Sequence, residues 1–156
     1  MQPSGLGDQI VRVVKLLNAH RHQLPRLHPA VDPAAYPLLF ALRPGPARPS
    51  EVAALIHSDI STVSRQASAF AHEGLIERLP DPGDGRAQLL SLTTAGTELL
   101  TLIRAHREDW LGRLLADWSH EDRCAFARLT GRFADAVERQ LTTHPQCPTT
   151  VSKDLV

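Results

Sequence analysis

Apolar residues recur at three- and four-residue spacing along much of this chain, as they do on the buried face of a helix. The first such stretch predicts an amphipathic helix over residues 6–24, ended by Pro25, which lacks a backbone N–H. Wide apolar faces near the C-terminus predict a long helix over 94–118 and a last helix that runs to about Leu141. The pattern therefore predicts a mostly helical protein.

The segment after the first helix is interrupted by prolines. Asp32 followed by Pro33 is typical of a helix start, where the aspartate caps free N–H groups and the proline stands in the first turn. Pro37 lies one turn later, so we expect this second helix to be kinked or to begin late. Residues 43–49 are rich in proline and predict a stiff loop.

The next residues predict two helices separated by a tight turn. Pro49 begins the short first helix, and His57 and Ser58 form the turn. Asp59 is a suitable N-cap for the second helix, and Gly74 is suited to end it because glycine accepts a positive φ. The apolar positions of the second helix form one predicted buried stripe, made of Ile60, Val63, Ala67 and Phe70.

A β-hairpin is predicted to follow. Residues 75–79 and 88–92 are strand candidates, and the turn-forming residues 80–87 between them predict the hairpin tip. Helix, turn, helix and hairpin in this order predict a winged helix-turn-helix over about 33–93. The hairpin would be its wing.

The length of 156 residues corresponds to one domain that can bury a substantial core. We expect helices over about 6–24 and 94–142 to flank the winged helix-turn-helix, and residues 143–156 to form a loose tail. Aromatic residues make up only 4%, so the core must consist of leucine, valine and alanine, which suits packed helices.

The formal net charge is zero, which does not by itself indicate a nucleic-acid partner. Residues 48–86 contain four arginines and six acidic residues, so the predicted DNA-binding stretch has a net charge of −2. Phosphate binding needs local cations at the contact surface and not a basic average. A few arginines, repeated by a dimer, can therefore suffice.

The two cysteines, Cys124 and Cys147, lack CxxC spacing, which fits a reducing compartment without a disulfide framework. Cys124 is predicted to be a small buried residue. The N-terminus lacks the basic and apolar regions of a signal peptide, and no apolar run approaches the roughly 20 residues that span a bilayer. We expect a cytoplasmic protein that does not bind membranes.

Four short motifs follow one another between the turn and the long helix: Ser-Thr-Val-Ser-Arg-Gln (61–66), Gly-Leu-Ile-Glu-Arg (74–78), Asp-Pro-Gly-Asp-Gly-Arg (81–86) and Leu-Thr-Thr-Ala-Gly (92–96). Their order and spacing resemble those of the MarR family of bacterial winged helix-turn-helix transcriptional regulators. The resemblance covers about residues 48–100. The chain departs from the family at Arg48, where a Ser or Thr often caps the helix, and at His57 and Ser58 in the turn.

The resemblance implies that the second of the two helices and the wing bind double-stranded DNA. A recognition helix presents its N-terminal residues to base edges in the major groove, where Arg65 could pair with guanine O6 and N7. Arg86 at the hairpin tip could enter the adjacent minor groove, and the family implies that Asp84 holds it by a charge-assisted hydrogen bond. The candidate DNA-binding residues are Ser61, Thr62, Ser64, Arg65, Gln66, Ser68, Asp84 and Arg86.

Some roles within this set stay open. The Ser and Thr hydroxyls are as well suited to phosphates as to bases. Gln66 stands between the buried and the exposed face of its helix. An ordinary solvated helix face and an ordinary surface turn are the alternatives to a DNA contact.

The terminal helices carry more apolar surface than one compact winged helix needs, at Trp110, Trp118, Phe126 and Phe133. In the family the first and last helices interlock two subunits, which implies a homodimer and a pseudo-palindromic operator. Closure of the monomer's own core is the alternative. The family also implies a pocket for a possible small-molecule effector, whose candidate residues could equally be core: His20, Tyr36, Phe40 and Trp110.

The predicted function is a dimeric repressor that a small-molecule effector releases from DNA. A winged-helix module that binds protein and not DNA is one alternative, favoured by the net charge of −2. A metal-binding sensor or metalloenzyme using His20, His22 and His28 is another, but residues two apart diverge on a helix and no complete ligand set is evident. We therefore expect no cofactor, no metal and no enzymatic activity.

Overall fold

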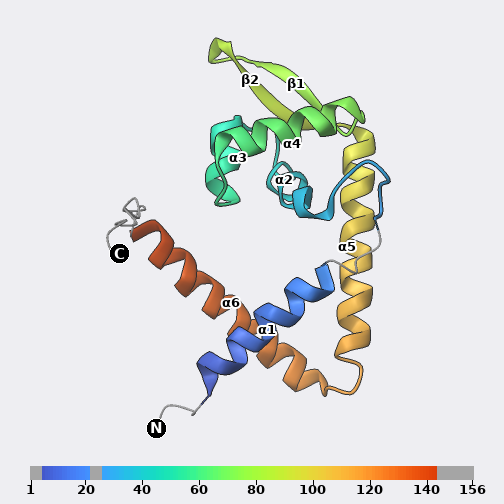
Figure 1. The fold of residues 1–156 in the computed structure, drawn as a ribbon, viewed down its shortest axis with the longest axis vertical. Coiled ribbons are helices and arrows are strands. Elements are labelled where there is room, and N and C mark those ends of the chain that lie inside the picture. The colour runs from blue at the N-terminus through green and yellow to red at the C-terminus, as the bar shows by residue number, and fades with distance from the viewer. Residues whose placement is uncertain (1–4, 22–25, 144–156) are drawn as a thin grey trace, which may run out of the picture. The chain divides into compact units, whose positions relative to one another are not determined.

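The computed structural model describes residues 5–21 and 26–143 (Figure 1). Its elements are, in chain order, α1 (Leu6–Arg21), the 3-10 turn η1 (Pro33–Ala35), α2 (Tyr36–Ala41), α3 (Pro49–Leu55), α4 (Ile60–His72), β1 (Ile76–Asp81), β2 (Asp84–Leu92), α5 (Thr94–Leu114) and α6 (His120–Thr143). The fold is mostly helical with one antiparallel hairpin, which confirms the predicted fold class.

The chain divides into two compact units, and the division falls inside α5 between Glu108 and Asp109. The first unit holds the predicted winged helix-turn-helix, residues 33–93, together with α1 and the beginning of α5. The second holds the end of α5 and α6. Over the described ranges, no helix is long and apolar enough to cross a membrane.

The helix bounds differ from the predicted ones at several ends. α1 is described as far as Arg21, and Pro25, predicted to end it, lies outside the described residues. The long helix ends at Leu114 and not at 118, because the chain turns through hydrogen bonds such as Trp118 N–H to the Leu115 carbonyl (3.1 Å). α6 continues to Thr143, slightly beyond the predicted end.

Of the kink and the late start predicted at Pro37, the structure shows the late start. Asp32 accepts a hydrogen bond from the Ala34 N–H (2.8 Å) and so caps a short 3-10 turn, after which α2 begins at Tyr36. Pro37 then lies in the first turn of α2, where its missing N–H leaves no helical hydrogen bond unmade.

The hairpin is longer than predicted. β1 and β2 pair in register from Ile76 opposite Leu92 to Asp81 opposite Asp84, with an irregularity after Pro80. The turn itself is only Pro82–Gly83, because the backbone of the residues predicted as tip still pairs across the hairpin. Figure 1 shows the hairpin beside α4, with which β1 is in contact.

The core of the first unit is aliphatic apart from Tyr36 and Phe70, as the composition predicted. Leu38, Leu39, Val52, Val63 and Leu90 are completely buried. Along α4 the predicted stripe is buried at Val63, Ala67 and Phe70, but Ile60 is 54% exposed and its predicted burial is wrong. The full buried set is Val31, Ala35, Tyr36, Leu38, Leu39, Leu42, Val52, Ala53, Val63, Ala67, Phe70, Leu75, Ile76, Leu90, Leu99, Leu100 and Ile103.

A compact joint connects the end of α4, the base of the hairpin and the start of α5. Gly74 has φ 69°, and the N–H of Leu75 bonds the Phe70 carbonyl (2.9 Å), which is the predicted glycine helix end. The Thr93 hydroxyl donates to the Gly74 carbonyl (2.7 Å) and accepts from the Gly96 N–H (3.1 Å). Thr93 is therefore the cap of α5 and also holds it against the end of α4.

In the second unit, Ser119 caps α6 as predicted, since its hydroxyl accepts from the Asp122 N–H (3.1 Å). The apolar residues of α6, among them Phe126, Leu129 and Phe133, are roughly half exposed. Cys124 is exposed as well, with its Sγ 3.5 Å from Nε2 of His120 one turn earlier. Its predicted burial is wrong because this face of α6 has no covering element within the unit.

Candidate nucleic-acid interface

The N-terminus of α4 is organised by Asp59. Its carboxylate accepts hydrogen bonds from the Ser61 hydroxyl, from the Thr62 hydroxyl (2.7 Å) and from the Thr62 N–H (2.8 Å). These hydrogen bonds hold the pKa of Asp59 well below its usual range, and the bond from Ser61 has the largest effect. The hydroxyl protons of Ser61 and Thr62 are thus occupied in the free protein. Their oxygens remain available as acceptors, which suits base amino groups better than phosphates.

Arg65 lies on the exposed side of α4, one turn after Thr62. Its Nη2 donates to the Thr62 hydroxyl oxygen over 3.3 Å, a long contact that leaves the guanidinium free to reorient. The Ser68 hydroxyl donates to the Ser64 carbonyl (2.9 Å) and accepts from Nη2 of Arg78 (3.0 Å). The exposed Arg78 of β1 therefore joins this surface.

The sequence analysis missed Arg78. In a regular strand Arg78 would share the face of the buried Ile76, so the alternation gave no sign that its side chain reaches the exposed side of α4.

Gln66 is turned away from this surface. It is half-buried, and its Oε1 is completely buried. With Asp32, Arg65 and Phe70 it lines a hollow of about 300 Å³ between α4 and the connector before α2. Of the predicted α4 residues, Ser61, Arg65 and Ser68 are exposed, Thr62 and Ser64 are half-buried, and the Gln66 carbonyl is not available to DNA in this conformation.

At the wing, Arg86 is exposed close to the hairpin turn. Asp84 accepts a hydrogen bond from the backbone N–H of Arg86 (3.1 Å). The ion pairs of the described residues do not include one between the two side chains, so Asp84 orders the Arg86 backbone and not its guanidinium. The guanidinium is left free for a ligand.

Two departures from the expected motif have structural consequences. His57 closes the turn between α3 and α4 with φ 51°, a left-handed conformation that costs a residue other than glycine about 1 kcal/mol. The Ser58 N–H nevertheless bonds the Ala53 carbonyl (2.9 Å), so the turn is closed. Arg48, which precedes α3, forms an ion pair with Asp81 of the wing that the sequence did not predict.

The candidate effector residues have different surroundings. Tyr36 is only 7% exposed, and burial raises the pKa of its phenol. Phe40 lies under the Arg107 guanidinium, 5.3 Å from the ring centroid, and lines an apolar hollow of about 520 Å³ with Pro37, Pro44, Leu55 and Ile56. His20 on α1 and Trp110 on α5 are half-buried in different units. A shared effector pocket stays a prediction.

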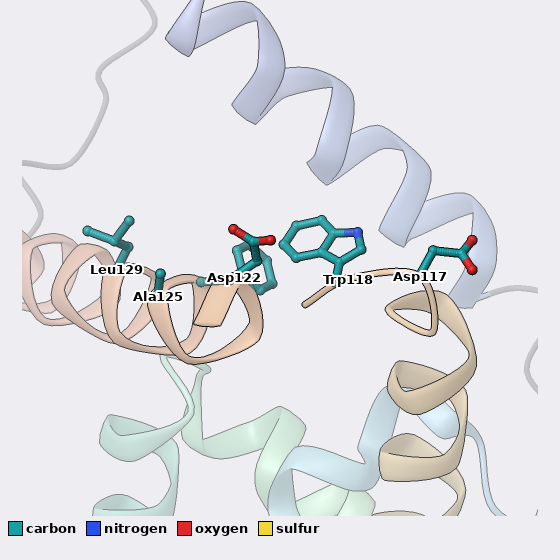
Figure 2. A pocket seen from close by; sticks show the side chains of 6 residues that line it. Asp117, Trp118, Asp122, Ala125 and Leu129 are labelled. Atoms are coloured by element: carbon teal, nitrogen blue, oxygen red, sulfur yellow. The ribbon is translucent and has the colours of Figure 1, made fainter. Parts of the chain in front are cut away.

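The second unit contains a hollow of about 440 Å³ near the start of α6 (Figure 2). Trp118 and Phe126 form an edge-to-face pair in its wall, with ring centroids 5.4 Å apart. As for a metal centre, residues 5–21 and 26–143 contain no group of three or more His, Cys, Asp or Glu side chains placed to hold an ion. His22 lies outside the described residues.

The chain is similar in sequence and in fold to known transcriptional regulators. A sequence profile of the MarR family matches residues 41–87, from the end of α2 to the first part of β2. The HTH-type transcriptional regulator YxaD of Bacillus subtilis is 39% identical over 92 residues, which are 59% of this chain and 64% of that protein. Over the winged helix-turn-helix the chain is therefore similar to the MarR family.

Solved structures of MarR proteins have the same fold. A probable transcriptional regulator from Pseudomonas aeruginosa has a TM-score of 0.64 and 28% identity, covering 82% of this chain and 98% of its own. MarR itself has a TM-score of 0.62 and 25% identity over 89% of this chain and 99% of its own. The residues matched by the family profile include all the candidate DNA-binding positions from Ser61 to Arg86. The alignment with YxaD leaves about a third of the length of that protein uncovered.

Proposed function

We propose that this protein is a sequence-specific, DNA-binding transcriptional regulator of the MarR family that acts as a homodimer. The observation that carries this proposal is the presence of two exposed arginines on one unit, Arg65 on the recognition helix and Arg86 at the wing. Neither guanidinium is neutralised by a carboxylate among the ion pairs of the described residues. Two such cations per subunit match one major-groove and one minor-groove contact.

Asp59 and Asp81 are two of the six carboxylates in residues 48–86 and have partners within the protein, although the net charge of the stretch stays at −2. Asp59 is occupied by the start of α4, and Asp81 is paired with Arg48. The charge of Asp81 is therefore balanced locally by Arg48, whereas Asp59 keeps its negative charge, which the N-terminus of α4 stabilises. A dimer would in addition double the number of free arginines.

Selection of bound duplexes from a random pool tests this function with the full-length protein. We expect an enriched pseudo-palindrome whose half-sites lie about one helical turn, or about 10 bp, apart. Affinity for it should fall steeply with salt, because each phosphate contact adds a slope of about −0.9 to log K against log salt. The Arg65→Ala/Arg86→Ala double variant is the control and should enrich no sequence.

A protein-interaction module without DNA binding is the competing function, and the net charge of −2 over residues 48–86 favours it. That function predicts a pool that stays random after repeated selection and no salt-dependent affinity for any duplex. Either result would refute the proposed DNA-binding role.

The homodimer is proposed from the apolar surface that each unit leaves exposed. Leu6, Val13, Val14 and Leu17 of α1 are each about half exposed, as are Phe126, Leu129, Phe133 and Leu141 of α6. Exposed apolar surface repeated over two whole helices is typical of an interface. We further propose, from the family resemblance, that a small-molecule effector regulates DNA binding by preferring one spacing of the two recognition helices.

Phe133→Glu is expected to convert the dimer into a monomer at low micromolar concentration, because a carboxylate would be buried without a partner. Light scattering after size-exclusion chromatography measures the mass. Arg128→Gln, which changes the net charge by the same amount on the opposite, exposed side of α6, is the control and should stay dimeric. A Phe133→Glu protein with the wild-type mass would show that this part of α6 is not the interface.

A further inference from the structure

We propose that Arg48 is a positioning residue, which ties the wing to the N-terminus of α3 and thereby fixes Arg86 for DNA binding. The inference rests on the proposed DNA-binding function. It assigns a role to a residue that departs from the usual Ser or Thr of the family at this position.

The contact itself is short and specific. Nε of Arg48 donates to Oδ2 of Asp81 over 2.7 Å, and Nη2 lies 2.6 Å from the same oxygen. The Asp81 side chain is only 10% exposed, whereas that of Arg48 is 42% exposed. The other carboxylate oxygen, Oδ1, accepts from the Gly83 N–H in the hairpin turn (2.8 Å). One carboxylate therefore links α3 to the turn of the wing.

Local structure frees the Arg48 side chain for this contact. Arg48 precedes α3 with an extended backbone (φ −69°, ψ 147°), and its N–H donates to Oε2 of Glu51 (2.8 Å). Its side chain does not act as a cap, because a guanidinium has no acceptor for the free N–H groups of the helix. The side chain can instead extend to the wing.

The wing needs such a link because its far end is otherwise a two-stranded hairpin, which is marginally stable alone. Ala47, the neighbour of Arg48, pairs with Leu90 through two backbone hydrogen bonds of 3.0 and 2.8 Å. That pairing holds β2 near the base of the hairpin. The strand pairing is irregular after Pro80, at the point where Arg48 binds Asp81.

A chain of contacts leads from Arg48 to Arg86. Asp81, held by Arg48, is the register partner of Asp84 across the turn. Asp84 in turn accepts from the Arg86 N–H (3.1 Å). A wing ordered before binding does not lose conformational freedom on DNA, which favours affinity. Because the Arg48 guanidinium is already paired with Asp81, it acts through the wing and not as a phosphate contact.

A double-mutant cycle on the full-length protein and its selected operator tests the proposal. Arg48→Ala should weaken binding about tenfold. Without the Arg48 contact, both wings of the dimer would become ordered only on binding DNA, and the conformational entropy lost at that step lowers the affinity. The Arg48→Ala/Arg86→Ala variant should bind within about twofold of Arg86→Ala alone, because Arg48 acts only through Arg86. Arg43→Ala, which removes an exposed arginine of the same unit, is the control for lost charge and should not reproduce this pattern.

Independent, multiplicative losses in the cycle would overturn the proposal and make Arg48 a direct DNA contact. Hydrogen exchange supplies a readout that needs no DNA. The Gly83 and Arg86 amides should exchange faster in Arg48→Ala than in the wild type. In Arg48→Lys they should exchange more slowly than in Arg48→Ala, and in Arg86→Ala they should exchange at the wild-type rate. Unchanged exchange in Arg48→Ala would refute the link itself. Failure of the wild-type protein to bind any DNA would refute the proposed function and leave the exchange result valid.

Discussion

Replacing Gly96 with alanine is expected to destabilise the protein by about 3 kcal/mol, the upper range for overpacking a core. A Cβ at this position would lie 2.0 Å from the Leu75 carbonyl oxygen and 3.0 Å from its carbon. Both atoms belong to the backbone, so no side chain can rotate away. The Leu75 carbonyl also accepts from the Thr93 N–H (3.1 Å), and moving it would open the base of the wing.

Gly112 provides a matched control in the same helix. A Cβ at Gly112 would meet no heavy atom within 4 Å. Gly112→Ala should therefore stabilise the protein by about 0.5–1 kcal/mol, through the helix propensity of alanine. Urea unfolding followed by circular dichroism measures both changes. Equal midpoints for Gly96→Ala and the wild type would show that α5 can move away from Leu75 without cost.

The elements that the sequence predicted best are those fixed by local chemistry. Asp59 and Ser119 cap helices through hydrogen bonds to residues three positions later, and Gly74 ends α4 through its own φ. Such interactions depend only on residues that are close in sequence, so the local sequence pattern predicts them. Gly96 is different, because only the packing of α5 on Leu75 shows why a side chain is not tolerated there.

The burial errors have a common physical cause. Periodicity identifies an apolar helix face, but it does not say whether the same chain covers that face. Ile60 and Cys124 lie on helix surfaces that their own unit leaves open, and both were predicted to be buried.

The sequence predicted the exposed arginines of the candidate site, but it did not predict the side-chain contacts between distant parts of the chain. Arg65 follows from the outward face of a capped helix, and Arg86 from the hairpin turn. The pair of Arg48 and Asp81 joins residues that are 33 positions apart, so no local pattern indicates it. The inward turn of Gln66 likewise depends on packing against the connector near Asp32.

Arg65→Ala is expected to cause the largest loss of operator affinity. A bidentate contact to guanine contributes about 1–3 kcal/mol of discrimination, and a dimer makes two such contacts, so the loss should be about thirtyfold or more. The fold should be preserved, because the Arg65 side chain is exposed and its described contact with Thr62 is long, at 3.3 Å. Fluorescence anisotropy on the selected operator and on a scrambled duplex, at one salt concentration, measures affinity and specificity together.

Arg65→Lys separates the two possible contacts. Lysine keeps the positive charge but lacks the planar fork that pairs with guanine O6 and N7. If Arg65 reads a base, Arg65→Lys should retain binding to the scrambled duplex and lose most of the preference for the operator. If Arg65 contacts only phosphate, lysine should restore both affinities, and alanine should weaken both duplexes equally. If Arg65→Ala keeps the wild-type affinity and the wild-type preference for the operator, Arg65 does not contribute to DNA recognition by α4.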